Sequence, residues 1–489
     1  MSSRPAVLAI DEGTTGVTCL VVGEDSRVLG RAYREITQHF PQPGWVEHDA
    51  EEIFAKTVAA AREAMDAAAA DVLAIGITNQ RETIVLWDRR TGAPVHRAIV
   101  WQDRRTAKRC AELAPHAGRI RELTGLVTDP YFSGTKLEWL LQHVAGNPDQ
   151  LLAGTIDAWL IWRLTDGQVH ATDHTNASRT MLYDLGRMGW SDELCDLLHV
   201  PRALLPQVRP SGGDFGVAVA RHLGRDIPIR GVAGDQQAAL FGQGCWTAGS
   251  AKNTYGTGAF LLQHTGASRP ATVEGLLTTV ACGPRGEPAY ALEASIFIAG
   301  AAIQWLRDGL GIVAQASDTD AMARSLTSND GVYFVPALVG LGSPWWEPDA
   351  RGTIVGLTRG TTRAHLARAA LEAMAHSTAD VMDAMSAASG QRFERLRVDG
   401  GATANGWLMQ FQADVLGLPV ERPANVETTA TGAAGLAGIT TGLWPTPERF
   451  LAAQRFDLFT PAATEDVRAQ RKEWARAVST ALHWARAGG

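Results

Sequence analysis

The stretch AIDEGTTG, residues 9–16, places one carboxylate and two hydroxyls at a short turn between two apolar runs. Gly13 permits a tight turn with exposed backbone amides, and Thr14 and Thr15 add hydroxyl donors. Such donors suit a phosphate, and the carboxylate of Asp11 suits the magnesium ion that accompanies a nucleotide. An ordinary β-hairpin with glycine and threonine in its turn is the alternative interpretation.

Paired charges follow a second apolar run. The stretch GITNQRET, residues 76–83, sets Arg81 and Glu82 directly after a strand expected over 72–78. Ligands of open α/β sheets bind beyond the carboxyl ends of the strands, and adjacent donors and acceptors suit vicinal hydroxyls. A surface ion pair at the end of a strand would show the same pattern.

A further carboxylate stands where a strand meets a helix. Asp235 ends the apolar run GVAGD and begins the expected helix DQQAALFG. As a general base it would accept the proton of a hydroxyl group during phosphoryl transfer. As a structural residue it would instead cap the helix, because aspartate is a preferred N-cap.

Aromatic side chains and a glycine pair lie near the same strand ends. Trp101, Tyr131 and Phe260 could face a ligand, although each residue alone fits core packing better. The glycines at 400–401 form a strand-to-helix turn that would let a phosphate or a flat group approach, or serve only as a tight turn. Small residues recur at helical spacing over 427–438 and predict close helix packing.

Strands and helices alternate around these residues, which indicates an α/β layered architecture. We expect a helix over 50–70, strands over 72–78 and 98–103, and a helix over 104–114. The stretch KNTYGTGAFLL, 252–262, is again a strand, a Gly-Thr-Gly turn and a strand. The second half of the chain therefore repeats the opening hairpin.

This repeat predicts a duplicated domain. A long helix over 363–385 and a strand over 395–401 follow the second hairpin, and the glycine-rich stretch 241–253 lies before it. We therefore divide the chain into domains at 1–246 and 247–489. The two Gly-Thr turns would face each other and grip one polyphosphate from both sides. Neither a Walker A pattern nor a dinucleotide fingerprint opens the chain, which disfavours P-loop and Rossmann folds.

Composition narrows the class of protein. The 489 residues carry a net charge of −7, which leaves no basic footprint for nucleic acid. We expect no signal peptide and no membrane span, because charges interrupt the early apolar run and every later one. Five scattered cysteines predict reduced thiols in the cytoplasm.

Longer motifs carry a resemblance to the FGGY family of carbohydrate kinases. YFSGTKLEWLLQH (131–143) and GTIVGLTRGTTRAHLARAALE (352–372) resemble the two patterns of that family. Within it, the motifs PGWVEHD, GITNQRET, TNASRTMLYD, GDQQAALFGQ, NTYGTG and DGGATANGWLMQFQADVLG are most similar to those of members that phosphorylate glycerol. The resemblance implies two ribonuclease-H-like domains of the actin, sugar kinase and heat-shock chaperone superfamily around an ATP cleft, and it leaves a homo-oligomer open.

The resemblance also implies roles for individual residues, with glycerol and ATP as substrates and Mg²⁺ as cofactor. A polyol pocket would consist of Arg81, Glu82, Trp101, Tyr131, Asp235, Gln236 and Phe260, with Asp235 as the general base. Phosphate contacts would come from Thr14, Thr15, Thr257 and Gly258, and nucleoside contacts from Gly300, Gln304, Gly401 and Asn405. Asp11 and Asp235 would hold Mg²⁺, partly through water.

Two positions depart from the family pattern. Thr18 stands where members that use glycerol usually carry arginine and pentulose or gluconate kinases carry lysine, so a basic phosphate contact is missing. Asp226 stands where members inhibited by fructose 1,6-bisphosphate carry an arginine, so we expect that inhibition to be weak or absent.

Three other functions compete with glycerol phosphorylation. The first turn departs from the pattern of the members that use glycerol. A kinase for another small polyol or ketose, such as a tetritol or dihydroxyacetone, therefore stays a possible function. An actin-like or chaperone-like ATPase would need no pocket that recognises hydroxyls, which the residues around Arg81 would provide. A sugar sensor without catalytic activity would not need Asp235.

Overall fold

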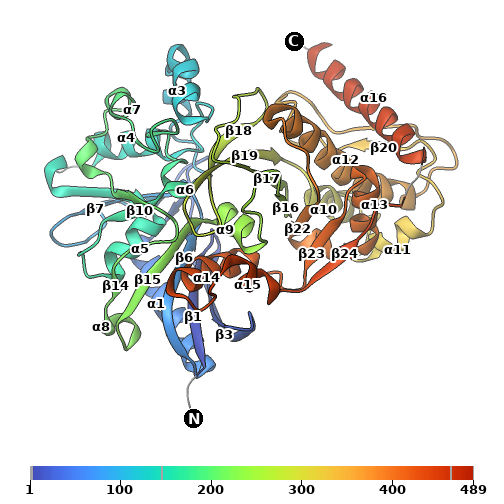
Figure 1. Cartoon of the computed structure of the whole chain (residues 1–489). Helices are drawn as coiled ribbons and strands as arrows, with labels where there is room; N and C mark the ends of the chain where they lie inside the picture. Colours follow the sequence, from blue (N-terminus) through green and yellow to red (C-terminus); the bar gives the residue numbers. More distant parts are fainter. Residues whose placement is uncertain (1–3, 145–146, 463–464, 488–489) are drawn as a thin grey trace.

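The computed structural model describes residues 4–144, 147–462 and 465–487 and contains two large sheets with helices on both (Figure 1). The first sheet has the order β14-β15-β6-β1-β2-β3. Its strands span Pro5–Glu12 (β1), Gly16–Gly23 (β2), Val28–Glu35 (β3), Asp71–Asn79 (β6), Val217–Ala218 (β14) and Ile227–Gly234 (β15). β1, β2 and β3 are antiparallel, whereas β6 runs parallel to β1 and β15 parallel to β6.

The second sheet repeats this plan with the order β18-β19-β17-β16-β22-β23-β24. Its strands span Ala251–Tyr255 (β16), Ala259–Gly266 (β17), Leu277–Cys282 (β18), Pro288–Ile296 (β19), Leu396–Asp399 (β22), Val420–Pro423 (β23) and Phe456–Phe459 (β24). β16, β17 and β19 are antiparallel, and β22 and β23 run parallel to β16. Both predicted hairpins and the predicted duplication are confirmed by these matching orders and directions.

Smaller sheets and sixteen α-helices among the described residues complete the chain. A five-stranded sheet joins Gln38–His39 (β4), Glu47–His48 (β5), Ala98–Ile99 (β8), Ile84–Asp88 (β7) and Leu151–Thr155 (β9), and the strand predicted over 98–103 is limited to β8. Three pairs join Ala171–Asp173 (β10) with Gln207–Arg209 (β13), Tyr183–Asp184 (β11) with Gly189–Trp190 (β12), and Tyr333–Val335 (β20) with Thr353–Val355 (β21).

The helices agree with the predicted ones in place, although some are shorter. The helix predicted over 104–114 is α2 (Ala107–Glu112), that over 363–385 is α12 (Arg363–Ser389), and that over 50–70 is α1 (Ala50–Ala68). The others are Ala117–Thr124 (α3), Ser133–His143 (α4), Ile156–Leu164 (α5), His174–Ala177 (α6), Asp192–Leu197 (α7), Ala220–Leu223 (α8), Asp235–Gly242 (α9), Gly300–Gln304 (α10), Asp318–Arg324 (α11), Gly406–Leu416 (α13), Thr428–Thr441 (α14), Pro447–Ala452 (α15) and Glu465–Ala487 (α16).

The central strands β1, β2 and β6 of the first sheet are buried on both faces. Successive side chains of a strand point to opposite faces, so Leu8 and Ile10 pack in one core with Phe54 of α1, whereas Val7 and Ala9 pack in another. This second core contains α14, which comes from the far end of the chain. α14 therefore covers a sheet that is built entirely from the first half of the sequence.

Small residues let α14 approach this sheet closely. A Cβ added at Gly76 of β6 would meet the carbonyl oxygen of Ala433, and one added at Gly432 would meet the carbonyl oxygen of Ala238 in α9. The small-residue spacing over 427–438 is therefore close helix packing, as predicted. The division of the chain between residues 246 and 247 stays a prediction. α14 belongs to the second half of the sequence but packs on the sheet of the first half.

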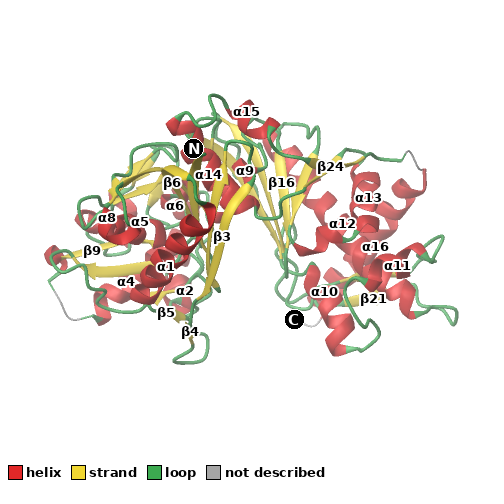
Figure 2. Ribbon diagram, turned by 90° about the horizontal axis from the view of Figure 1, so that it is seen from below, coloured by secondary structure: helices red, strands yellow, loops and turns green. Residues whose placement is uncertain are grey.

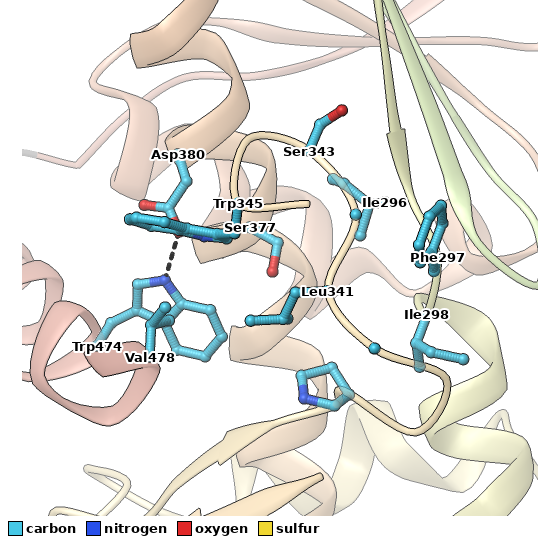
Figure 3. A pocket seen from close by; sticks show the side chains of 13 residues that line it. Ile296, Phe297, Ile298, Leu341, Ser343, Trp345, Ser377, Asp380, Trp474 and Val478 are labelled. Carbon is cyan, nitrogen blue, oxygen red and sulfur yellow. Dashed lines mark hydrogen bonds between the residues drawn. The ribbon is translucent and has the colours of Figure 1, made fainter. Parts of the chain in front are cut away.

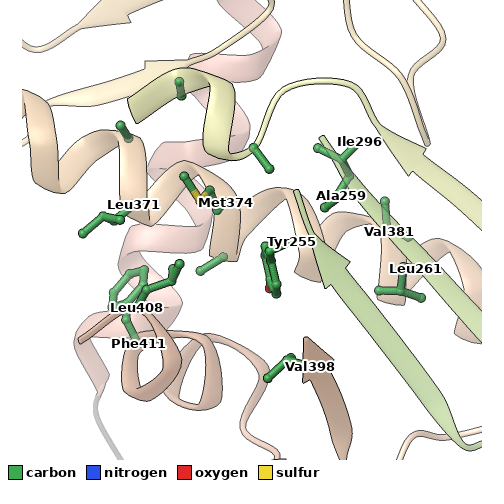
Figure 4. Packing of buried hydrophobic residues seen from close by; sticks show 14 of the residues in the cluster. Tyr255, Ala259, Leu261, Ile296, Leu371, Met374, Val381, Val398, Leu408 and Phe411 are labelled. Atoms are coloured by element: carbon green, nitrogen blue, oxygen red, sulfur yellow. The ribbon is translucent and has the colours of Figure 1, made fainter. Parts of the chain in front are cut away.

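The second domain has a core of its own. Tyr255, Leu261 and Val398 of the sheet pack against Met374 of α12 and Leu408 of α13 (Figure 4). The opposite face of this sheet places Leu262 and Ala291 against Leu240 of α9. Because α9 also packs on α14, it lies between the two sheets (Figures 1 and 2).

Two general properties follow from the described residues. No helix among them is long and apolar enough to cross a membrane. All five cysteines are buried and none is paired in a disulfide.

Candidate active site

The first residue of α9 lies where the two sheets meet. Gly234 takes the N-cap position, so the alternative that Asp235 caps the helix is wrong. Oδ1 of Asp235 accepts a hydrogen bond of 2.7 Å from the amide of Gln236 and lies 3.1 Å from Nε of Arg81. The Asp235 side chain is 34% exposed, whereas that of Arg81 is 2% exposed. Asp235 is thus the accessible acid of an otherwise buried group.

A buried cluster of four charged side chains supports Asp235. Arg81 donates to both carboxylate oxygens of Glu293 at 2.7 and 3.1 Å, and Arg179 donates to Glu82 at 2.7 Å and to Glu293 at 3.1 Å. We call Arg81, Glu82, Arg179 and Glu293 the buried charge cluster. Since Glu293 lies on β19, the cluster joins the two halves of the chain.

The charges in this cluster shift one another's pKa. Burial opposes ionisation of Glu293, but Arg179 and Arg81 overcome it and lower its pKa to about 2. Burial raises the pKa of Glu82, which the two arginines only partly counter. Glu82 also has a φ of 64°, a strained conformation of the kind found at functional sites. The predicted alternative, a surface ion pair of Arg81 and Glu82, is wrong because both side chains are buried.

Two predicted pocket aromatics border the cluster. The rings of Trp101 and Tyr131 meet edge to face with centroids 5.5 Å apart, and the guanidinium of Arg179 lies 5.9 Å from the Tyr131 ring. Nε1 of Trp101 donates a hydrogen bond of 2.9 Å to Oγ1 of Thr14. A predicted pocket residue therefore contacts a predicted phosphate residue directly.

The second sheet contributes the opposite wall. Phe260 of β17 pairs with Ser295 of β19, and Leu262 pairs with Glu293, so all four side chains share the face that looks toward α9. Lys252 of β16 lies on this face as well, because it pairs with Leu262. The structure thus brings Phe260 to the same side of the second sheet as the charge cluster.

The first hairpin places Asp11 beside Thr18. The two residues are directly paired across β1 and β2, so their side chains share one face. Burial, followed by the charges of Asp235 and Glu427, raises the pKa of Asp11 to about 8. Thr15, at the turn, is exposed and accepts a bond of 3.3 Å from the Tyr33 hydroxyl through its carbonyl oxygen.

The second hairpin contacts α10 through the backbone. The amide of Gly300 donates to the carbonyl of Gly256 at 3.0 Å, and the carbonyl of Thr257 accepts from Ala299 at 2.8 Å. Thr257 is exposed and Gly258 is buried at this turn. The structure therefore brings the predicted phosphate residues of this hairpin next to Gly300.

The remaining predicted nucleoside residues lie on α10, after β22 and at the start of α13. Gln304 is exposed on α10, and Gly401 is exposed after β22. Asn405 caps α13, where its Oδ1 accepts from the amide of Leu408 at 2.9 Å and its Nδ2 donates to Thr319 at 3.1 Å. The side chain of Asn405 is thus engaged in local structure.

Sequence reasoning missed three charged residues of this site. Arg179 lies within the motif TNASRTMLYD, but the resemblance to the family assigned it no role. Glu293 is a single charge inside the largely apolar strand PAYALEASI, and Lys252 is the only charge in the mostly buried strand AKNTY. A charge inside a buried strand is a usable signal because it needs a partner.

A separate small pocket of about 20 Å³ lies in the second domain (Figure 3). It is lined by the end of β19 and by Asp380 and Trp474, whose Nε1 donates to Asp380 at 2.7 Å. None of the site residues predicted from the sequence lines it.

Two α/β units of matching sheet order, joined by a buried charge cluster beside an accessible carboxylate, define a two-domain enzyme of the sugar kinase and actin-like ATPase fold, as predicted. The chain belongs to the FGGY family of carbohydrate kinases. The N-terminal domain of that family matches residues 6–242, and its C-terminal domain matches residues 251–441.

Individual relatives match this chain over almost its whole length. The glycerol kinase of Dechloromonas aromatica is 54% identical, with 98% of each chain covered. The glycerol kinase of Carboxydothermus hydrogenoformans is 52% identical, with 99% of each covered. The structure of Plasmodium falciparum glycerol kinase with ADP superposes with a TM-score of 0.93 at 33% identity, with 99% of each chain covered.

Proposed function

We propose that this chain transfers the γ-phosphoryl group of ATP to glycerol and releases sn-glycerol 3-phosphate and ADP. Two proteins named glycerol kinase are 54% and 52% identical to this chain over almost its whole length, which supports glycerol as the substrate. The observation that carries the chemistry is Asp235, an accessible carboxylate held beside a buried arginine. The polyol and nucleotide residues named from the sequence are part of this proposal.

Asp235 is arranged to act as a general base. Its Oδ1 is occupied by the Gln236 amide and by Arg81, and within residues 4–144, 147–462 and 465–487 no protein group bonds to Oδ2. Oδ2 accepts the proton of a glycerol hydroxyl while the hydroxyl oxygen attacks the γ-phosphorus. The bond from that phosphorus to the β,γ-bridging oxygen breaks, and ADP leaves with the electron pair.

The buried charge cluster positions this base and the polyol. Glu293 holds Arg81 through two bonds, so the guanidinium cannot rotate away from Asp235. The ordered donors and acceptors of Arg81 and Glu82 would pair with the other hydroxyls of glycerol. A pocket with buried paired polar groups rejects an analogue that lacks a hydroxyl by about 10⁴-fold.

The residues at the first hairpin fit a magnesium ion. The Asp11 and Asp235 carboxylates repel each other, and in the part of the chain that the structure describes Asp11 has no ion-pair partner. No group of three or more histidine, cysteine or acidic side chains among the described residues forms a ready cation cage, so two carboxylates with water and phosphate oxygens would hold the ion. When bound, Mg²⁺ neutralises the charge on the phosphates of ATP.

A panel of small polyols and ketoses with Mg-ATP tests this function. We expect ADP and sn-glycerol 3-phosphate to form in equal amounts, with the highest kcat/KM for glycerol. A higher value for a tetritol or for dihydroxyacetone would reassign the substrate within the family. ATP hydrolysis that does not depend on any polyol would favour the chaperone-like ATPase instead.

A further inference from the structure

Lys252 is a buried cation that the proposed mechanism does not use. It lies on β16 in the second domain, and its side chain is fully buried. Its Nζ donates to Oε1 of Gln236 at 2.5 Å and to Oγ1 of Thr254 at 2.7 Å. Since Gln236 is the second residue of α9, Lys252 bridges the second sheet to the helix that carries Asp235.

The chemistry of the amine fixes the orientation of the Gln236 amide. An ammonium has three N–H donors and no acceptor. Burial lowers the pKa of Lys252, whereas the charges of Asp399 and Asp235 raise it. In the ammonium form, Nζ can only donate, as it does to Oε1 of Gln236 and to Oγ1 of Thr254. Oε1 of Gln236 must therefore face Lys252, and Nε2 must face away from it.

Nε2 of Gln236 is left as an available donor. In the residues that the structure describes, it makes no hydrogen bond, and the Gln236 side chain is partly exposed. The adjacent residue along α9 is Asp235, whose carboxylate is an acceptor. The start of α9 thus offers a substrate one acceptor and one donor side by side.

We propose that Lys252 is a positioning residue that holds Gln236 with its NH₂ group toward the polyol, so that Gln236 acts only as a donor to a substrate oxygen. This inference rests on the proposed function and explains how the polyol pocket discriminates between substrates. The substrate group at this place must accept a hydrogen bond from Gln236. A hydroxyl or a carbonyl group can do so, whereas an ammonium group cannot.

A double-mutant cycle in the full-length protein tests the inference, with glycerol binding by calorimetry and steady-state kinetics as readouts. Gln236→Met removes the donor, and we expect its Kd and KM for glycerol to rise about three- to tenfold with kcat changed less than about twofold. Lys252→Met frees the amide to rotate, and we expect a rise of similar size. The double variant should bind glycerol no more weakly than Gln236→Met alone, because Lys252 acts only through Gln236.

Two further variants distinguish a loss of glycerol binding from a loss of folded protein. Thr254→Val removes the other partner of Nζ with little change of shape, and we expect a smaller rise in Kd that disappears in the Gln236→Met background. Asn253→Leu is the matched control, because its side chain bonds Thr378 on the other face of the same strand. It should lower Tm without raising the Kd for glycerol.

The outcomes separate the two proposals. If the wild-type protein phosphorylates glycerol but the Lys252 and Gln236 effects multiply in the double variant, the positioning role is wrong and the function stands. If the wild-type protein neither binds nor phosphorylates glycerol, the proposed function fails, and the role of Lys252 fails with it.

Discussion

The indole of Trp101 and the hydroxyl of Thr14 are joined by a hydrogen bond of 2.9 Å. Trp101 belongs to the proposed polyol pocket, and Thr14 lies at the turn proposed to contact phosphate. The backbone amide of Trp101 also donates to Thr83, whose hydroxyl donates to Gln80. Gln80 in turn donates through its backbone to Glu12 at 2.7 Å. The pocket and the first hairpin are therefore one connected unit.

Replacing Trp101 tests this connection. Trp101→Phe keeps an aromatic ring beside Tyr131 but removes the donor to Thr14. We expect kcat/KM for ATP to fall about fivefold, the usual effect of one lost hydrogen bond. Trp139→Phe is the control, because its ring packs on Trp45, 5.3 Å away between centroids. An equal loss in the control would attribute the effect to packing.

The role of Asp235 as base predicts a selective loss of turnover. Asp235→Asn keeps the shape of the side chain but cannot accept the proton, so kcat should fall about 10²-fold or more while glycerol still binds. Binding measured by calorimetry separates the two effects. Asp226 is an exposed carboxylate that directly precedes β15, outside the candidate site. Asp226→Asn should therefore leave kcat unchanged. Turnover near the wild-type rate would remove Asp235 from the chemistry.

The buried charge cluster predicts a dependence of stability on pH. The folded-state pKa of Glu293, about 2, lies below the ordinary glutamate value of 4.5, so its ionisation stabilises the fold above pH 4.5. That contribution is lost as the pH falls from about 4.5 toward 2.

Glu293→Gln removes this contribution and leaves two buried arginines with fewer partners. We expect a loss of about 3–5 kcal/mol in the free energy of unfolding at pH 7. Urea unfolding of both proteins from pH 7 to pH 3 should show the difference shrinking below pH 4.5. A difference that stays constant over this range would contradict the assignment of the low pKa to Glu293.

Thr18 offers a gain-of-function test. Thr18 is half-buried, and its side chain shares a face of the sheet with that of Asp11. Thr18→Arg would place a cation beside the carboxylate and the phosphate turn. We expect kcat or KM for ATP to improve by a charge-assisted hydrogen bond, about 1.5–3 kcal/mol, with little change in KM for glycerol.

Kinetics and Tm together decide the outcome for Thr18→Arg. Unchanged Tm with unchanged or poorer ATP kinetics would reject the gain. A large fall in Tm would show that the new guanidinium is buried without a partner.

Resistance to fructose 1,6-bisphosphate is also expected. Asp226 is exposed, and its Oδ1 accepts from the Ala220 amide at 2.7 Å, so its charge would repel a phosphate. The neighbouring Arg225 pairs with Asp71 at 2.8 Å, and Arg230 pairs with Asp214. Both arginines are therefore engaged already. Inhibition at micromolar concentrations in a steady-state assay would show that one of them is released to bind the sugar phosphate.

Local patterns in the sequence were sufficient to predict much of the fold. Both hairpins, α1 and α12 were predictable because their apolar spacing and turn residues agree with the final structure. The strand after residue 98 was predicted too long, because only Ala98–Ile99 pairs with neighbouring strands. Its following residues turn away to place Trp101 beside Thr14.

The partners of the site could not be predicted in the same way. Arg81 meets Glu293 across 212 positions of sequence, and no local pattern encodes such a distant pair. Lys252 and Gln236 lie closer in sequence, but their contact depends on how α9 packs against the second sheet. The motifs singled out Arg81, Glu82 and Asp235, whereas the partner that Arg81 has in the second half of the chain became visible only in the structure.

The return of α14 to the first sheet affects how the protein is made. While a ribosome synthesises the chain, the sheet face that bears Val7 and Ala9 stays uncovered until residues 428–441 have emerged. At 5–20 residues per second, the wait after α9 is roughly 10–40 s. During that time the nascent first half exposes an apolar surface of the kind that chaperones recognise. A product truncated before α14 can cover the face that packs on α1 but leaves the opposite face of its first sheet uncovered.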